Sequence, residues 1–407
     1  MGDRLRSSLC IVLGVESQIG LAILRELGSA GVRVIAIAHT NSAIGLWSNY
    51  TWKRVVVGPP RSEAVLAAIR SIGDEFGPCS LITVSESNLL WLSVHREALG
   101  CVVPAIPPAD ALALVLNKDL TLQAAAAVGL RVPRTAAPTS FGEIERLADE
   151  FPFPAVLKWS DPNSIAPQLA AEGLELLKSE YIYDGSELLE ASKRYRAIDQ
   201  WPLVQQYCPG RGLGQFFFMH SGHALRRFQH IRIAEWPPEG GFSSVCDAVP
   251  LESHVDLQEL SIALLRKLGW EGVAMVEFRF DETTGQAYLM EINGRFWGSF
   301  PLATHSGAKF ALLAHCAAIG APFPSLALPR DDLRCRMVAT EVKRLARIFF
   351  SPSRIRDRSF KVRPLTELAR FIADFFRPNV RYYVWKFMDP MPFVVDLINW
   401  MVKRRST

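Results

Sequence analysis

Apolar residues in the first hundred positions form short continuous runs, separated by segments with helical spacing. The runs at Leu9–Gly14, Val32–Ala38 and Ser80–Val84 alternate with helix-like segments such as Ile19–Ser29. Continuous apolar runs of strand length are typical of parallel strands that helices cover on both faces. The pattern therefore predicts an α/β, Rossmann-like domain over residues 1–110.

Beyond this region the pattern mixes helices and strands in an α+β manner. One helical segment is predicted over Ala109–Val128, and it ends at Gly129 and Pro133, which are common helix stop signals. The elements predicted after it are helices at Phe141–Glu150 and Val255–Leu268, strands at Pro154–Trp159 and Pro202–Cys208, and two strands within 213–236. A second, α+β region is therefore expected over residues 111–330.

The segment Gly272–Arg295 reads as a β-hairpin, because two strands with alternating apolar residues flank a turn at Asp281–Gly285. Side chains alternate between faces along a strand, so the apolar positions fix a register. The register that buries one face forms three pairs: Val276 with Ile292, Phe278 with Met290, and Phe280 with Tyr288.

The same register places Glu277 opposite Glu291 on the other face, with Asn293 two residues further along. Like charges opposite each other destabilise a sheet, and a divalent cation with oxygen ligands would offset that repulsion. An ordinary solvent-facing strand with two acidic residues remains an alternative. Arg295 favours the metal, because a guanidinium that binds anions beside an acidic metal site suits phosphoryl chemistry.

The sequence MEINGRFWGS at 290–299 resembles the ExNxR signature of the ATP-grasp superfamily, which includes carbamoyl-phosphate synthase large subunits, biotin carboxylases and D-alanine–D-alanine ligases. The resemblance covers roughly residues 8–320, and it is greatest to predicted carboligases similar to carbamoyl-phosphate synthase. It implies a Rossmann-like pre-ATP-grasp domain at 1–110 and a two-lobed ATP-grasp domain at 111–330. A small lid-like subdomain is implied at about 134–208.

The resemblance also implies roles for individual residues. Lys118 and Lys158 would bind the ATP phosphates, although a surface helix lysine is an alternative for Lys118. A lysine that ends a buried strand, as Lys158 does, is costly unless its ammonium meets an anion. The remaining assignments are Gln205, Gln206, Tyr207 and Cys208 at the adenine hinge, Glu277, Glu291 and Asn293 on Mg²⁺ or Mn²⁺, and Arg295 with Lys158 in catalysis.

Three segments are less typical of the family or less certain. The hinge carries Gln205 and Gln206 where many relatives have Glu, and the loop at 160–168 that should cover the phosphates contains no glycine. His230, Arg232 and Ser244 lie on segments that line the acceptor side in relatives. A histidine at a strand edge and an ordinary turn are the alternative interpretation there.

The turn from Gly14 to Gly20 argues against a nicotinamide oxidoreductase. It lacks the middle glycine of GxGxxG, and Glu16 would repel a phosphate. The favoured hypothesis is an ATP-dependent ligase that forms ADP and joins a small-molecule carboxylate to an amine. The alternative is a protein that binds ATP without turnover and acts as a scaffold on a membrane surface.

Charge is unevenly distributed along the 407 residues. The net charge is +4, yet residues 331–407 hold 17 Lys and Arg against 8 Asp and Glu. This segment is predicted to be a basic, mainly helical C-terminal extension. Its aromatic residues favour docking on the body, with contact between 365–407 and the inner membrane face as the alternative. Nucleic acid is not expected as a partner, since no binding motif accompanies the charge.

The seven cysteines are scattered and never form a CxxC pair, which favours a reducing compartment over disulfides or zinc. No apolar stretch approaches the ~20 residues of a membrane-spanning helix. A cytoplasmic protein is therefore expected. The sequence leaves a homodimer open and does not identify the substrates.

Overall fold

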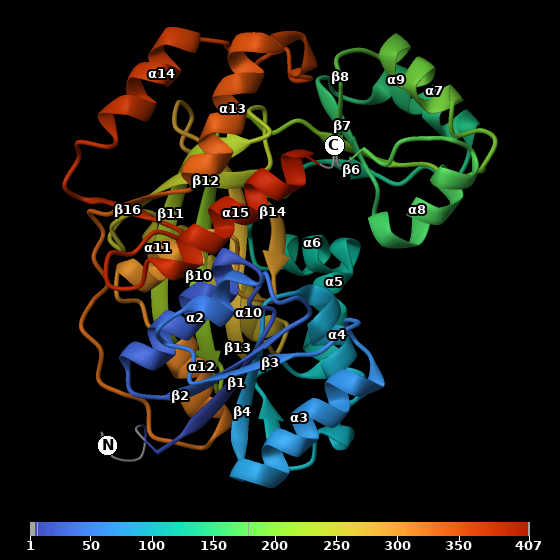
Figure 1. The fold of residues 1–407 in the computed structure, drawn as a ribbon. Helices are drawn as coiled ribbons and strands as arrows, with labels where there is room; N and C mark the ends of the chain where they lie inside the picture. Colours follow the sequence, from blue (N-terminus) through green and yellow to red (C-terminus); the bar gives the residue numbers. More distant parts are fainter. Residues whose placement is uncertain (1–4, 6, 178, 406–407) are drawn as a thin grey trace.

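The computed structural model describes residues 5, 7–177 and 179–405, and it contains three β-sheets. Figure 1 shows a five-stranded sheet near the N-terminus, a long seven-stranded sheet through the centre, and a small four-stranded sheet set apart from both. Residues 406–407, which close the predicted extension, lie outside the described residues.

The first sheet confirms the α/β interpretation of the N-terminal region. Its strands are parallel in the order β3-β2-β1-β4-β5. They are β1 (Leu9–Leu13), β2 (Arg33–Ala38), β3 (Lys53–Val56), β4 (Cys79–Thr83) and β5 (Val102–Pro104). The connecting helices are α2 (Gln18–Ser29), α3 (Glu63–Phe76) and α4 (Glu86–Val94), with 3₁₀ turns η1 (Ile44–Trp47) and η2 (Arg96–Leu99).

The turn between β1 and α2 has a structural explanation. Gly14 has a φ of +102°, and a Cβ on Gly20 would lie 2.5 Å from the Gly14 carbonyl oxygen. Both glycines therefore let the helix start close against the strand. Glu16 accepts a hydrogen bond from the backbone N–H of His39 at 2.6 Å. The carboxylate thus fastens this turn to the end of β2.

The central sheet has the order β14-β13-β10-β11-β12-β15-β16. Its strands are β10 (Arg211–His220), β11 (His223–Trp236), β12 (Phe242–Ala248), β13 (Gly272–Asp281), β14 (Gln286–Asn293), β15 (Arg334–Arg336) and β16 (Val380–Tyr382). Helices α5 (Ala109–Leu116), α6 (Lys118–Ala127) and α10 (Val255–Lys267) share one apolar cluster with its first face.

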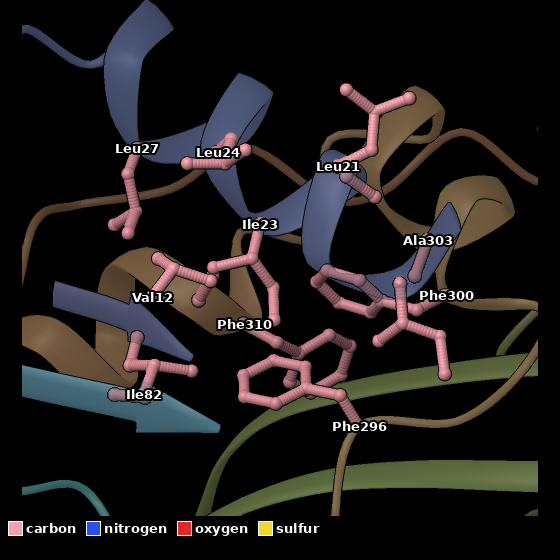
Figure 2. Packing of buried hydrophobic residues seen from close by; sticks show 14 of the residues in the cluster. Val12, Leu21, Ile23, Leu24, Leu27, Ile82, Phe296, Phe300, Ala303 and Phe310 are labelled. Carbon is pink, nitrogen blue, oxygen red and sulfur yellow. The ribbon is translucent and has the colours of Figure 1, made fainter. Parts of the chain in front are cut away.

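The other face of the central sheet packs against the N-terminal domain. Phe216, Phe218 and Met275 from the sheet belong to the same cluster as β1 and α2. Figure 2 shows how Phe296, Phe300 and Phe310 fill the space beneath α2. These three rings come from the loop after β14 and from helices α11 (Phe300–His305) and α12 (Phe310–Ala318). The two regions therefore share one core.

The prediction of one continuous helix over 109–128 was wrong. The chain breaks at Asn117, whose backbone is extended and whose side chain accepts a hydrogen bond from the Leu120 N–H. Asparagine is a favoured N-cap because its side chain satisfies a free N–H of the first turn. Helix α6 therefore starts anew at Lys118, which places that lysine at the beginning of a helix.

The third sheet belongs to a small lobe, called the lid here, that covers residues 134–208. Its strands have the order β6-β9-β7-β8, namely β6 (Thr135–Ala136), β7 (Ala155–Lys158), β8 (Glu180–Ile182) and β9 (Leu203–Gln206). Helices α7 (Phe141–Glu150) and α9 (Gly185–Lys193) pack on it. The glycine-free segment expected as a loop is largely helical, because α8 spans Pro162–Ala171.

The C-terminal extension is only partly the helical appendage that its sequence predicts. It contains η3 (Pro352–Arg354) and helices α13 (Val338–Phe350), α14 (Pro364–Ala373) and α15 (Met391–Arg405), yet β15 and β16 extend the central sheet. Asp389 is fully buried and accepts hydrogen bonds from Arg25, Ser48 and the N–H of Asn49. The extension is therefore built into the body.

Helix α15 lies on the N-terminal domain through one face and exposes apolar side chains on another. Asn399 donates to the carbonyl of Ser42, and Val395 packs against the shared core. The exposed apolar residues are Phe393, Val394, Leu397, Ile398, Met401 and Val402. Within the described part of the chain, no helix has both the length and the apolar character needed to cross a membrane.

Candidate active site

The acidic pair lies where the hairpin pattern predicted it. Glu277 on β13 is paired with Glu291 on β14, and Val276 is paired with Ile292. Asn293 lies two residues beyond Glu291, and its side-chain N–H₂ donates to Glu291 Oε1 at 2.8 Å. The three predicted metal ligands are therefore brought together on one face of the sheet.

The rest of the predicted register was wrong, because β14 contains a β-bulge at Met290. Phe278 pairs with Leu289 instead of Met290, and Tyr288 lies opposite Arg279 instead of Phe280. A bulge inserts an unpaired residue and turns side chains on either side of it. Leu289 is consequently buried in the core, while Met290 lines the cleft beside the two acids.

Glu277 is neutralised by Arg232 on strand β11. The Arg232 Nη2 lies 2.6 Å from Glu277 Oε2, and its Nη1 lies 3.0 Å from Glu235 Oε1. Arg279 adds a second guanidinium, 3.3 Å from Glu235 Oε2. The sequence-based expectation that only a bound cation would offset the acidic pair was therefore wrong. A protein cation already does so for Glu277.

Glycine in the intervening strand makes this pairing geometrically feasible. Strand β10 lies between β11 and β13, so the Arg232 side chain must cross it to reach Glu277. A Cβ on Gly212 would lie 2.6 Å from Arg232 Cδ. The missing side chain therefore leaves the space through which the guanidinium reaches the acid.

Burial shifts the acid–base properties of this group. Desolvation raises the pKa of Glu277, while the nearby Arg232 lowers it and Glu291 raises it further. The pKa of Glu235 is lowered, because the two guanidiniums outweigh the cost of its burial. The floor of the site thus holds two carboxylates and two guanidiniums in alternation.

The two predicted phosphate-binding lysines lie at the same cleft. Lys158 ends strand β7 of the lid and donates from Nζ to Gln205 Oε1 at 3.0 Å. Burial lowers the pKa of Lys158, and the charge of Glu291 opposes that effect. Lys118 lies within 3.5 Å of the Trp159 carbonyl oxygen, measured from its Nζ. The surface-helix alternative for Lys118 is therefore not the arrangement found.

A cleft between the lid and the central sheet joins these groups. Its empty volume, counted out to open solvent, is about 1320 Å³. The hinge segment from Gln205 to Cys208 lines it, as the sequence predicted. The other lining residues used here are Lys118, Lys158, Tyr181, Tyr207, Arg232, Glu235, Arg279, Glu277, Met290 and Glu291.

Several of the predicted substrate and catalytic residues lie elsewhere. His230 and Ser244 are buried, with His230 Nδ1 hydrogen-bonded to Ser299 and the ring packed against Phe216. Neither side chain lines the cleft, whereas Arg232 does. Arg295 donates to the Phe296 carbonyl and lines a second cavity of about 870 Å³, also counted out to solvent.

Sequence analysis missed four residues that line the cleft: Tyr181, Glu235, Arg279 and Met290. Arg279 could have been found, because it follows Glu277 by two positions on the same strand. Glu235 and Arg232 share such a spacing only if a bulge is assumed, and β11 does contain irregular pairing after Arg232. Met290 was assigned to the wrong face by the unbroken register.

Comparisons with known proteins were made by sequence and by fold. No family model matches the chain. The carbamoyl phosphate synthase large chain of Rubrobacter xylanophilus is 25% identical over 343 residues, which cover 78% of this chain. The chain spans about a third of that protein's length, since the match covers 31% of it.

Solved structures give a broader match. The ADP complex of N5-carboxyaminoimidazole ribonucleotide synthetase has a TM-score of 0.59 at 14% identity, covering 79% of each chain. The biotin carboxylase domain of Hydrogenobacter thermophilus 2-oxoglutarate carboxylase, a dimer with MgADP and bicarbonate, has a TM-score of 0.61 at 15% identity, covering 80% of this chain and 73% of its own. The chain has the ATP-grasp fold.

A third ATP-grasp structure, the L-amino acid ligase of Bacillus licheniformis, has a TM-score of 0.53 at 20% identity. It covers 77% of this chain and 74% of its own. All three neighbours extend over the N-terminal domain as well as the two lobes that form the cleft, given the share of the chain they cover. The fold predicted from the ExNxR resemblance is therefore confirmed.

The donor set of this ATP-grasp cleft fits magnesium held together with a polyphosphate. No three His, Cys, Asp or Glu side chains gather into a metal-binding group within residues 5, 7–177 and 179–405. Mg²⁺ does not need such a cage, because it prefers one or two carboxylates completed by phosphates and water. Glu277, Glu291 and the Asn293 amide supply that limited set of oxygen donors.

Proposed function

We propose that this protein is an ATP-dependent, magnesium-requiring ligase that joins a carboxylate to an amine and releases ADP. The observation that carries the proposal is the charge arrangement across one cleft. Glu277, Glu291 and Asn293 lie on its floor, and Lys118 and Lys158 lie at its wall. A triphosphate with a divalent cation is the kind of ligand that needs both groups at once.

The lysine at the end of β7 supports a polyanionic ligand. Burial lowers the pKa of Lys158, which means that its ammonium form is destabilised where it lies. A phosphate oxygen beside the ammonium would offset that cost, as buried charges are stable when paired. Its present partner, the neutral Gln205 side chain, offers a hydrogen bond without a charge.

In the proposed reaction, a carboxylate oxygen of the substrate attacks the γ-phosphorus of ATP, and the bond to the β,γ-bridging oxygen breaks to release ADP. The amine nitrogen then attacks the acyl phosphate carbon, loses a proton, and displaces inorganic phosphate. Bound Mg²⁺ would supply charge neutralisation at the β- and γ-phosphates. Such catalysis depends mainly on positioning and electrostatics.

The residues of this chain would divide that task. Lys118 and Lys158 would hold the phosphates, and the backbone of the hinge from Gln205 to Cys208 would contact adenine. Arg232 would keep Glu277 ionised and aimed at the metal. The role of Arg295 at the transferring phosphoryl group stays a prediction, which requires its side chain to leave the position it has beside Phe296.

Small carboxylate and amine substrates of the amino-acid type are the proposed substrate class. The L-amino acid ligase of Bacillus licheniformis shares the fold, and its name gives the class of substrate that it joins. In this chain, burial of His230 and Ser244 removes two of the predicted acceptor contacts from the cleft. The acceptor would therefore be held by other residues.

Replacing Glu291 by Gln tests the metal assignment. Turnover of ATP should fall by more than about a hundredfold, because the amide removes a charge that acts directly on the reacting phosphates. ADP release in the presence of pooled amino acids is the measurement, with circular dichroism to confirm the fold. Glu282→Gln, in the exposed turn of the same hairpin, is the matched control and should retain activity. Normal turnover by Glu291→Gln would refute the assignment.

A second candidate function is ATP binding without turnover on a membrane surface. The exposed apolar residues of α15 favour it, because an interfacial helix needs an apolar face. Flotation with liposomes that contain anionic lipid would detect it, and Leu397→Gln with Ile398→Gln should abolish flotation. Flotation that is absent from the unaltered protein, or ADP release that depends on an added carboxylate and amine, would exclude this candidate.

A further inference from the structure

The C-terminal extension contacts the lid through the loop that joins η3 to α14. Asp357 in this loop is only 5% exposed. Its Oδ1 accepts a hydrogen bond from the Tyr183 hydroxyl at 3.1 Å, and its Oδ2 accepts one from the Tyr207 hydroxyl at 3.0 Å. One carboxylate of the extension is therefore shared between two tyrosines of the lid.

The topology of the lid sheet explains why the two tyrosines converge. Strands β8 and β9 flank β7, and Ala155 is paired with both Ile182 and Gln206. The next residue after each of these partners is a tyrosine, at 183 and at 207. Both side chains therefore leave the same end of the sheet, on either side of β7.

Neighbouring residues of the loop strengthen this contact. The Arg358 N–H donates to the Tyr183 hydroxyl at 2.6 Å, and the Arg358 guanidinium lies 2.7 Å from Glu187 on α9. Ser359 Oγ lies 2.8 Å from the Tyr207 hydroxyl, and the Ser359 N–H donates to Asp357. The loop thus holds the lid at several points, and Asp357 is at the centre of them.

The contact is continuous with the wall of the nucleotide cleft. Tyr207 lines that cleft, and its ring lies edge-to-face with the ring of Tyr181 at 6.0 Å between centroids. The Tyr181 hydroxyl donates to the Glu239 carbonyl, and the Arg356 N–H donates to the Glu239 side chain. The loop, the hinge and the turn between β11 and β12 therefore form one connected group.

We propose that Asp357 is a positioning residue that latches the lid to the extension and holds Tyr207 at the wall of the nucleotide cleft. The proposal rests on the proposed function for its consequence, since only a nucleotide-binding cleft gives the position of Tyr207 a role. Asp357 itself does not line the cleft. The extension would thus act on nucleotide binding through the hinge.

The protonation states fit this arrangement. Burial raises the pKa of Tyr207 and of Tyr183, and the charge of Asp357 raises each of them further. Both phenols therefore stay protonated at neutral pH and donate to the carboxylate. Hydrogen bonds to an ionised acceptor are about twice as strong as neutral ones.

Tyr183→Phe and Asp357→Ala are the test variants. Tyr183 does not line the cleft, so its replacement removes one hydrogen bond of the latch without altering the cleft wall. Tyr288→Phe is the matched control, because that hydroxyl donates only to Gln286 within the hairpin turn region. The variants are compared by amide hydrogen exchange in strands β7, β8 and β9 without nucleotide, and by ADP affinity from calorimetry with Mg²⁺ present.

Both latch variants should speed exchange in the lid strands while leaving that of β1 unchanged. Asp357→Ala should also weaken ADP binding by about tenfold, with a smaller effect for Tyr183→Phe; a tenfold loss corresponds to about 1.4 kcal/mol. Tyr288→Phe should alter neither measurement. Lid exchange in Asp357→Ala that equals that of the unaltered protein would overturn the latch.

The two measurements separate this proposal from the proposed function. If the unaltered protein bound no ADP or ATP, the nucleotide function would fail, and the link from the latch to nucleotide affinity would fail with it. Lid exchange would still report whether Asp357 fastens the lid. Faster lid exchange with unchanged ADP affinity would confirm a fastening contact and overturn the positioning of Tyr207.

Discussion

The lid and the body that faces it are held together by different interactions. In the body, strands of the N-terminal and central sheets contribute to one large apolar cluster, in which Val12 and Ile82 meet Phe296 and Phe310. The lid has a small apolar cluster of its own, which includes Leu157 and other residues from β7, β9 and its helices. The body therefore has a common core, whereas the lid packs as a separate unit.

Polar contacts fasten the lid to the rest of the molecule. They include the Lys118 ammonium at the Trp159 carbonyl and the Asp357 carboxylate at Tyr183 and Tyr207. Polar contacts can exchange with water, whereas separating the body would expose a large apolar area. The difference teaches that the lid can move relative to the body at modest cost, as a cover for a nucleotide must.

Acidification should separate the two regions most strongly. His305 and His315 lie in the body, and burial lowers the pKa of each to about 4. The lid, residues 134–208, contains no histidine. Below an unfolded pKa of about 6.5, the unfolded chain takes up protons that the folded body refuses, so stability falls until pH reaches about 4. The expected loss is on the order of 3 kcal/mol per histidine.

Urea unfolding at pH 7 and pH 4.5 measures this loss, and amide exchange assigns it to the body or the lid. His315→Gln should flatten the pH dependence, because its ring nitrogens contact only the hydroxyls of Ser8 and Ser80 among described hydrogen-bond partners. An unfolding free energy that is equal at both pH values would contradict the assignment.

Truncation of matched leucines should give a smaller effect that differs between the regions. Leu188 in the lid and Leu265 in the body are both fully buried. Leu188→Ala should cost about 2 kcal/mol, the low end for Leu→Ala, because the small lid cluster can close around the gap. Amide exchange should quicken in the lid strands alone. Leu265→Ala should lower protection throughout the body, and a body-wide loss in Leu188→Ala would show that the lid is not separate.

The sequence predicted what depends on local periodicity. The parallel sheet, the hairpin and the opposition of Glu277 to Glu291 all follow from alternation of apolar residues. The bulge at Met290 was not predictable in this way, because Leu289 and Met290 are both apolar and either could face the core. The break at Asn117 was visible in principle, since asparagine followed by a helical segment is an N-cap signal.

The partners that cross the fold were beyond the reach of sequence patterns. Arg232 reaches Glu277 because a glycine stands in the strand between them, and strand order is not written in local periodicity. Asp357 meets Tyr183 and Tyr207 across more than a hundred residues of chain. The lysines at 118 and 158 were found only because the ExNxR resemblance supplied a place to look.

The burial of Asp389 bears on how this protein can be shortened. Arg25 is 5% exposed, and its charge is met by that carboxylate at 2.8 Å. A chain cut ahead of α15 would leave the guanidinium enclosed without its counter-ion, a loss of about 3–5 kcal/mol for such a broken pair. Tags and fusion partners therefore belong after residue 405, and trimming of the basic segment is expected to yield insoluble material.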